Sequence, residues 1–156
     1  MFLLLTLACG GYEFDVSGDV NDKAFTPVNA YWGASYIVFT SVEISCDEMW
    51  WVQKTNLTGE PPPTSTDLTA LQITYNNEDN EIVEGTYSVG GEAPIKAEYL
   101  AISGEEFTVS KSTEGILELD EKRNEDALTG SFNFAFSSGQ ISGTFDSIPW
   151  CINIKP

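Results

Sequence analysis

Hydrophobic and polar residues alternate with a period of two along most of this 156-residue chain. The alternation is clearest in segment 128–136, where Phe132, Phe134 and Phe136 are separated by small or polar residues. Because successive side chains of a β-strand point to opposite faces, this segment predicts a strand with one aromatic face. Ser138-Gly139 then predicts a tight turn into a second alternating strand. Such strands need another layer, or closure of their sheet, to cover the aromatic face.

The other predicted strands are rich in β-branched and aromatic residues and end at glycines or polar clusters. They cover residues 24–31, 35–44, 67–75, 85–91, 95–103 and 116–120, and Gly33 marks a hairpin turn between the first two. In total we expect about nine or ten short strands at a spacing of roughly ten residues. The pattern predicts an all-β fold, a single antiparallel β-sandwich or barrel.

Segment 46–54 lacks the alternation and predicts a short helical or irregular excursion. It contains Trp50 and Trp51, which would point in opposite directions if the segment were extended. An exposed tryptophan there would stack on a sugar ring or anchor a protein contact, and we take both residues as candidate ligand contacts. The alternative is that at least one of them fills the core.

The chain opens with an uncharged apolar run, residues 2–8, followed by Cys9 and two glycines. An apolar run that ends at a small residue is typical of an export signal, although no Lys or Arg precedes it, which leaves open a start upstream of Met1. The Ala8-Cys9 pair resembles the cleavage site of bacterial lipoproteins. The expected organisation is a signal peptide at 1–8, a lipidated N-terminus and tether at 9–11, and one β-domain at 12–156. Alternatively, Cys9 ends a short buried strand.

The charge balance excludes one class of partner. Lys and Arg number 7 against 24 Asp and Glu, which gives a net charge of −17 at pH 7. Nucleic-acid binding depends on cationic side chains that displace counterions from phosphates, so no nucleic acid is expected as a partner. An acidic surface keeps a domain soluble and attracts cations or basic partners.

The three cysteines suggest one disulfide. If Cys9 carries lipid, Cys46 and Cys151 remain as a pair, and disulfides persist in oxidising compartments outside the cytosol. Closing a loop of about 100 residues contributes up to about 4.7 kcal/mol to stability in the chain-entropy model. The alternative is a pair of buried free thiols.

The chain contains no histidine, which excludes His-dependent triads and the usual zinc sites. Two carboxylates flanking a cleft would suffice for glycoside hydrolysis, but with this many acids a candidate pair carries little information. The acidic clusters around Asp19 and Glu78 are typical of turns. We therefore predict no catalytic residues, no metal and no cofactor.

Short turn-and-strand motifs lie at residues 18–25, 85–90, 128–132 and 143–146, and Cys151 follows them. These motifs resemble those of uncharacterised lipoproteins of Gram-negative bacteria. The resemblance implies a β-rich cell-envelope domain with one disulfide and implies no activity. We expect a lipoprotein anchored to the outer membrane through Cys9, acting as a non-enzymatic binding or interaction module for a protein or carbohydrate partner. The alternatives are a calycin-like carrier of a small apolar ligand and, third, a carboxylate-based glycoside hydrolase.

Overall fold

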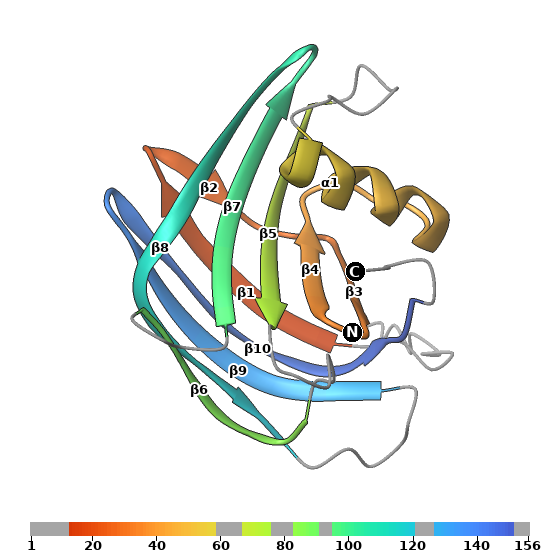
Figure 1. Ribbon diagram of the computed structural model, residues 1–156, viewed down its shortest axis with the longest axis vertical. Helices are drawn as coiled ribbons and strands as arrows, with labels where there is room; N and C mark the ends of the chain where they lie inside the picture. The colour runs from red at the N-terminus through yellow and green to blue at the C-terminus, as the bar shows by residue number, and fades with distance from the viewer. Residues whose placement is uncertain (1–12, 59–66, 76–82, 91–94, 121–126, 152–156) are drawn as a thin grey trace, which may run out of the picture.

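The computed structural model describes residues 13–58, 67–75, 83–90, 95–120 and 127–151 (Figure 1). These residues form ten β-strands and one α-helix. In chain order the elements are β1 (Glu13–Val20), β2 (Lys23–Phe25), β3 (Asn29–Gly33), β4 (Tyr36–Thr40), α1 (Cys46–Thr58), β5 (Leu68–Tyr75), β6 (Gly85–Val89), β7 (Ile95–Ser103), β8 (Glu106–Leu119), β9 (Ala127–Phe136) and β10 (Gly139–Pro149). The all-β prediction is confirmed.

All ten strands belong to one curled sheet, in the order β2-β1-β10-β9-β8-β6-β7-β5-β4-β3. The edge strands β2 and β3 follow each other in the chain, so residues 26–28 join the two edges covalently at one point. A second junction lies where Trp32 and Trp150 form an isolated parallel bridge and the Cys151 amide donates to the Trp32 carbonyl at 2.7 Å. The result is a shell that is not fully closed by hydrogen bonds.

The long strand β8 makes the sheet fold over itself. Its first half pairs with β7, and its second half pairs with β6 and β9. A register shift between Ser112 and Glu114 marks the change, as expected for a β-bulge that bends its strand. Figure 1 shows the consequence: β7, β5, β4 and β3 form one layer, and β9, β10 and β1 cross behind it.

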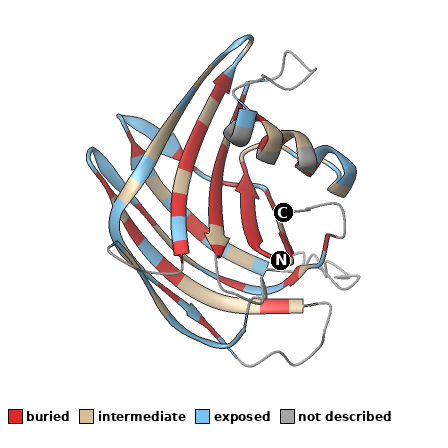
Figure 2. Ribbon diagram, in the orientation of Figure 1, coloured by how far each residue is buried: buried red, intermediate tan, exposed pale blue. Residues whose placement is uncertain are grey.

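The inner faces of the two layers enclose the main core. Phe39, Phe134 and Phe145 are almost fully buried there, and the Phe39 ring lies 5.7 Å from that of Phe145 and 5.4 Å from that of Phe132. Alternation between buried and exposed residues follows β1, β9 and β10, as Figure 2 shows. The predicted aromatic face of 128–136 is therefore confirmed, because Phe132, Phe134 and Phe136 all point into this core.

Helix α1 covers the outer face of the β4, β5 and β7 layer (Figure 1). Met49 and Val52 of the helix pack with Val38, Ala70 and Leu100 of the sheet in a second buried cluster. Strand β4 is consequently buried on both faces, and all five of its residues are inaccessible. This explains its uninterrupted apolar sequence, which is typical of a strand covered on both sides.

The helix begins with a capping box. The Glu48 amide donates to the Ser45 hydroxyl at 3.3 Å, and the Ser45 amide donates to the Glu48 carboxylate at 2.8 Å. A Ser-x-x-Glu pattern of this kind satisfies two backbone donors that the first helical turn would leave unpaired. The predicted excursion at 46–54 is therefore a helix, and it continues to Thr58.

Several predicted boundaries were wrong. The predicted strand 24–31 is two strands, because the chain leaves one edge of the sheet after Phe25 and joins the other edge at Asn29. The predicted strand 35–44 ends at Thr40, and β8 begins at Glu106 rather than near Ile116. The sheet is mixed rather than wholly antiparallel, since Val89 and Ile95 pair in parallel.

Candidate functional site

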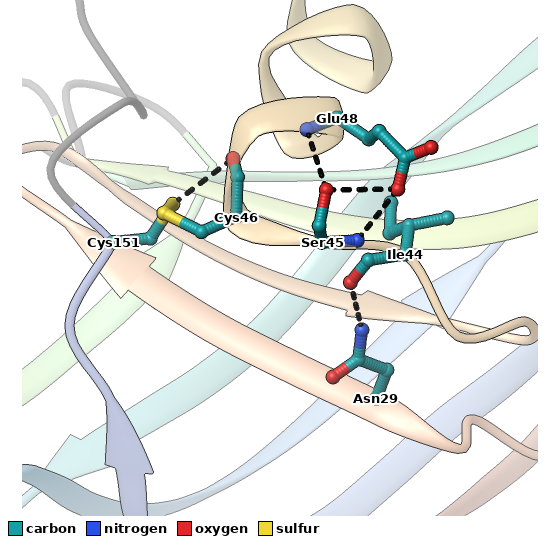
Figure 3. Close-up of a disulfide and its surroundings, with 6 residues drawn as sticks. All are labelled: Asn29, Ile44, Ser45, Cys46, Glu48 and Cys151. Atoms are coloured by element: carbon teal, nitrogen blue, oxygen red, sulfur yellow. Dashed lines mark hydrogen bonds between the residues drawn. A yellow bond between two sulfur atoms is a disulfide. The ribbon is translucent and has the colours of Figure 1, made fainter.

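The disulfide joins Cys46, the first residue of α1, to Cys151, which lies two residues beyond the end of β10 (Figure 3). Cys46 and Cys151 are 105 residues apart in sequence, and their Cα atoms are 5.5 Å apart. Cys151 is fully buried, and its Sγ lies 3.2 Å from the Cys46 carbonyl oxygen. Nearby, the Asn29 side chain donates to the Ile44 carbonyl at 2.6 Å and holds the segment before the helix against β3. The predicted pairing of these two cysteines is confirmed.

The two adjacent tryptophans do not lie on an extended segment, because both belong to α1. Neighbouring helical residues are separated by about 100° around the axis, so they do not point in opposite directions. Trp51 is half-buried, and the Lys54 ammonium lies 5.0 Å from its ring centroid. The side chain of Trp50 lies outside the description. The expectation that these residues contact a ligand is untested, and Trp51 already has a cationic neighbour.

The other two tryptophans pack together at the junction of the sheet edges. The rings of Trp32 and Trp150 are 4.4 Å apart between centroids and nearly perpendicular. Trp32 is 3 % exposed and Trp150 is 37 % exposed. They cover the end of the shell beside the disulfide, so their position is structural.

A concave acidic surface lies on the outer face of β1, β10, β9 and β8, the layer that α1 does not cover. We call this surface the acidic trough; its volume is about 460 Å³. Among the described residues that line it there is no lysine or arginine. The carboxylates that line it, all exposed, are those of Glu13, Asp15, Glu118, Asp120 and Asp146.

Register places Glu13 and Asp15 on one side of the trough and Glu118 and Asp120 on the other, with hydroxyl groups and Asp146 between them. One cross-strand row runs from Asp15 through Thr144 and Ser131 to Glu118. The acids at its two ends are three strand spacings apart, roughly 14 Å. The trough therefore presents two acidic sides, and its floor carries hydroxyl groups and the Asp146 carboxylate.

The second row carries a like-charge contact. Glu13 lies directly opposite Asp146, an arrangement that destabilises a pair of strands. The Thr129 hydroxyl donates to the Asp146 carboxylate at 2.8 Å, and the Asp120 amide donates to the Thr129 carbonyl at 3.1 Å. The structure thus gathers negative charge here from both ends of the chain. Sequence reasoning missed the trough, since only the alternating acids of β1 hinted at it.

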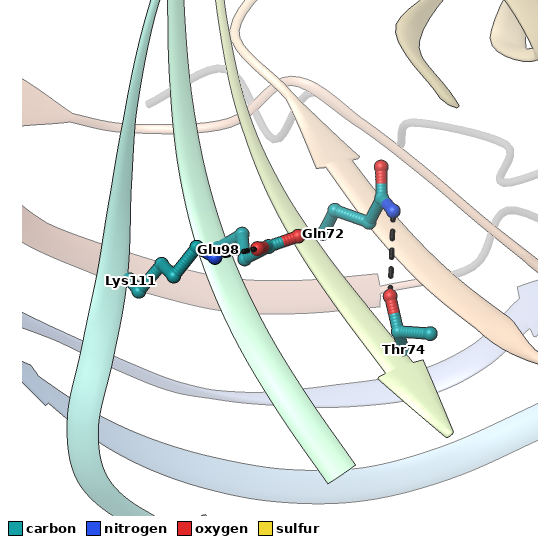
Figure 4. Close-up of polar contacts among 4 residues, drawn as sticks. All are labelled: Gln72, Thr74, Glu98 and Lys111. Atoms are coloured by element: carbon teal, nitrogen blue, oxygen red, sulfur yellow. Dashed lines mark hydrogen bonds and ion pairs between the residues drawn. The ribbon is translucent and has the colours of Figure 1, made fainter. Parts of the chain in front are cut away.

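A separate polar row crosses the outer face of the other layer (Figure 4). Gln72 on β5 pairs with Glu98 on β7, which pairs with Lys111 on β8. Lys111 lies 3.8 Å from the Glu98 carboxylate, and the Gln72 amide donates to the Thr74 hydroxyl at 3.3 Å. Burial, and secondarily the Glu98 carboxylate, raises the pKa of the nearby Tyr36 hydroxyl. This row pairs its own charges across the strands and has the character of a structural network.

No group of three or more Asp, Glu or Cys residues in the described part of the chain is arranged to hold a metal ion. None of the described helices is long and apolar enough to cross a membrane. Cys9, the predicted lipid-attachment residue, lies outside the described residues. Of the two acidic clusters noted in the sequence, the one around Asp19 belongs to the described residues, and the one around Glu78 lies outside them.

No family model matches this chain, and no match was found among the curated proteins or among the solved structures. The resemblance of its short motifs to envelope lipoproteins therefore stays a prediction, and function must be argued from the molecule itself.

Proposed function

We propose that this chain is an exported lipoprotein, anchored to the bacterial outer membrane through Cys9, whose β-domain is a non-enzymatic binding module. The observation that carries the proposal is the disulfide between Cys46 and Cys151. A bond between segments 105 residues apart persists where thiols are not kept reduced, that is, outside the cytosol. Its partners are the two cysteines that remain if Cys9 carries lipid.

The acidic trough is the surface on which the module binds its partner. Five carboxylates line the trough, and this concentration of negative charge favours a positively charged ligand by charge complementarity. The trough lies on the outer face of β1, β10, β9 and β8, which α1 does not cover. We infer that the partner is a protein that presents a lysine- or arginine-rich segment.

Packing of the inner core supports a binding surface over an internal carrier site. The carrier hypothesis needs a cavity lined by Phe132, Phe134 and Phe136. These three rings are at most 6 % exposed, Phe132 stacks on Phe134 at 5.1 Å, and Phe136 meets Tyr99 at 6.4 Å. Their faces are occupied by other rings, which is the behaviour of a filled core.

Anchoring is tested by growing cells with an alkyne-bearing fatty acid and expressing either the wild-type chain or Cys9→Ser. We expect label on the wild-type protein in the membrane fraction and none on Cys9→Ser, which should be released in soluble form. Equal labelling of the two proteins, or absence of label from both, contradicts the anchor. A label that survives in Cys9→Ser would place acylation elsewhere.

Binding is tested with an octalysine peptide in isothermal titration calorimetry. Asp15→Asn with Glu118→Gln removes one carboxylate from each side of the trough, and Glu43→Gln with Glu105→Gln removes two exposed carboxylates elsewhere. Exposed charge contacts are worth about 0.2–1 kcal/mol each, so the trough variant should bind about two- to thirtyfold more weakly. If both variants weaken binding equally, the trough is not the site and only net charge matters.

A further inference from the structure

The first half of β8 has one edge that no other strand occupies in the described part of the chain. Residues 106–111 pair with β7 along the opposite edge, and β9 pairs with β8 only from Ser112 onward. Among the described turns and loops, none forms a backbone hydrogen bond with these residues. Figure 1 shows the reason, because the β7–β8 hairpin extends beyond the end of β9. We call residues 106–110 of β8 the open edge.

The tight turn of this hairpin decides which backbone groups the open edge presents. Ser103 and Glu106 flank a two-residue turn, so they form a hydrogen-bonded pair of the ladder. Hydrogen-bonded and non-hydrogen-bonded pairs alternate along an antiparallel ladder. Phe107 and Val109 therefore point their N–H and C=O groups away from β7. Each of them offers one donor and one acceptor to a further strand.

The open edge has little of the protection that such edges usually carry. Proteins commonly block a free edge with proline, lysine, a bulge or a covering segment. The open edge contains no proline or lysine, and the register shift of β8 lies beyond it. The β1–β2 turn reaches it at its last residue, where the Asn21 side chain donates to the Ser110 hydroxyl at 2.9 Å. Its one charged residue, Glu106, lies next to the hairpin turn, so the centre of the edge is uncharged.

The sequence around Thr108 is complementary to itself in antiparallel register. Only odd-numbered residues present their backbone groups at this edge, so an antiparallel copy must pair odd-numbered residues with odd-numbered ones. When the pairing is centred on Thr108, Phe107 of each copy lies opposite Val109 of the other, and Glu105 lies opposite Lys111. Apolar pairs, Thr–Thr pairs and opposite charges are favourable cross-strand neighbours. Centring the pairing on Phe107 or Val109 instead would separate the two charges.

We propose that two copies of this chain associate through the open edge, with the two β8 strands antiparallel about a two-fold axis at Thr108. Phe107 and Val109 of both copies then meet on the face that carries α1, beside the apolar cluster to which they already belong. The Lys111 side chain is 79 % exposed, so its ammonium can contact Glu105 of the other copy as well as Glu98 of its own. This surface shares no lining residue with the acidic trough, and the inference stands whether or not the trough binds a basic segment.

The association is expected to be weak. Two such short edges form an interface below the standard size of about 1,200 Å² or more, and each copy carries a net charge of −17. At about 0.15 M salt the Debye length is about 8 Å, so the distant charges of the two copies are largely screened. We expect dissociation constants in the high micromolar range, and tighter association at about 0.5 M salt than at about 0.02 M.

The first test is sedimentation equilibrium of the Cys9→Ser chain, which carries no lipid, at concentrations from about 10 μM to about 1 mM. Thr108→Lys places two ammonium groups opposite each other at the axis, and we expect it to weaken dimerisation about fivefold. Thr86→Lys, at an exposed position of β6, changes the net charge equally and should not weaken it. A monomer at every concentration, or equal weakening by both substitutions, would overturn the proposal.

The second test determines the register by oxidative cross-linking. At the axis, the Cα atoms of the two Thr108 residues are about 4.5 Å apart, as in any non-hydrogen-bonded pair, and a disulfide spans about 4.4–6.8 Å. Thr108→Cys should therefore form a covalent dimer on non-reducing gels. Glu106→Cys should not, because Glu106 lies opposite Ser110 and its two copies are about 14 Å apart. Equal cross-linking of the two variants, or cross-linking of neither, would contradict this pairing.

Discussion

Replacing Cys46 and Cys151 with alanine removes the disulfide that cross-links the start of α1 to the segment after β10. In the chain-entropy model, opening a loop of about 100 residues lowers the free energy of unfolding by about 4.7 kcal/mol. Domains of this kind are stable by about 5–15 kcal/mol in total, so the loss is a large fraction of the whole. We expect the double variant to fold at 25 °C but to unfold readily on mild perturbation.

The assay is equilibrium unfolding in urea, followed by the fluorescence of the four tryptophans. With a denaturant slope of about 2 kcal/mol/M, the midpoint should fall by about 2 M. Dithiothreitol provides an internal control, since it should lower the wild-type midpoint to that of the variant and leave the variant unchanged. A variant whose midpoint lies within about 0.3 M of wild type, at unchanged slope, would refute the view that the disulfide constrains the unfolded chain.

Three further predictions test the packing, the cap and the titration of the domain. Phe39→Ala should lower the free energy of unfolding, measured with denaturant, by about 3–5 kcal/mol, because the buried Phe39 ring contacts other rings. Val28→Ala, at a side chain that is 51 % exposed, should lower it by less than about 0.5 kcal/mol. Hydrogen bonds from the Ser45 amide and hydroxyl lower the pKa of Glu48. In Ser45→Ala the hydroxyl is lost, so NMR titration should show a higher Glu48 pKa than in the wild type. In the wild type, the stability that the cap contributes should be lost as pH falls through this lowered pKa. Burial raises the pKa of Tyr87 to about 12, so the free energy of unfolding should decline as pH rises from about 10 to 12. The decline should be smaller in Tyr87→Phe, and equal alkaline unfolding profiles of the two proteins would contradict this role of Tyr87.

The parts of the fold that were predicted from sequence are mainly strands with one buried face and one solvent-exposed face. Segment 128–136 alternates because its aromatic side chains line the core and the residues between them face outward. Strand β4 was also predicted, although both of its faces are buried, because it is rich in β-branched and aromatic residues and follows the turn signal of Gly33. The disulfide followed from counting cysteines.

The parts that were missed have physical reasons. The first half of β8 carries only two apolar side chains, Phe107 and Val109, which are partly buried against the cluster beneath α1, so its alternating pattern is short. The separation of β2 from β3 depends on the curl of the whole sheet, which no local pattern reports. The acidic trough requires the pairing of β1 with β10, strands more than 100 residues apart, and register between distant strands is not encoded in either segment alone.

In the proposed function, the surface that binds a partner is separate from the core. The aromatic rings pack on the inside of the shell, and the carboxylates of the acidic trough lie on the outside of the same strands. Substitutions in the trough should therefore alter binding with little effect on the core, since surface changes away from special features are usually within about 0.5 kcal/mol.

The most direct measurement is peptide mapping, without reduction, of the chain purified from the membranes of the cell that makes it. We predict one cross-linked peptide pair that joins Cys46 to Cys151, and an N-terminal peptide that begins at Cys9 and carries the mass of a diacylglyceryl group. Alkylatable thiols at Cys46 and Cys151, or an unmodified peptide that still contains Met1 and Cys9, would contradict the placement of this domain outside the cytosol.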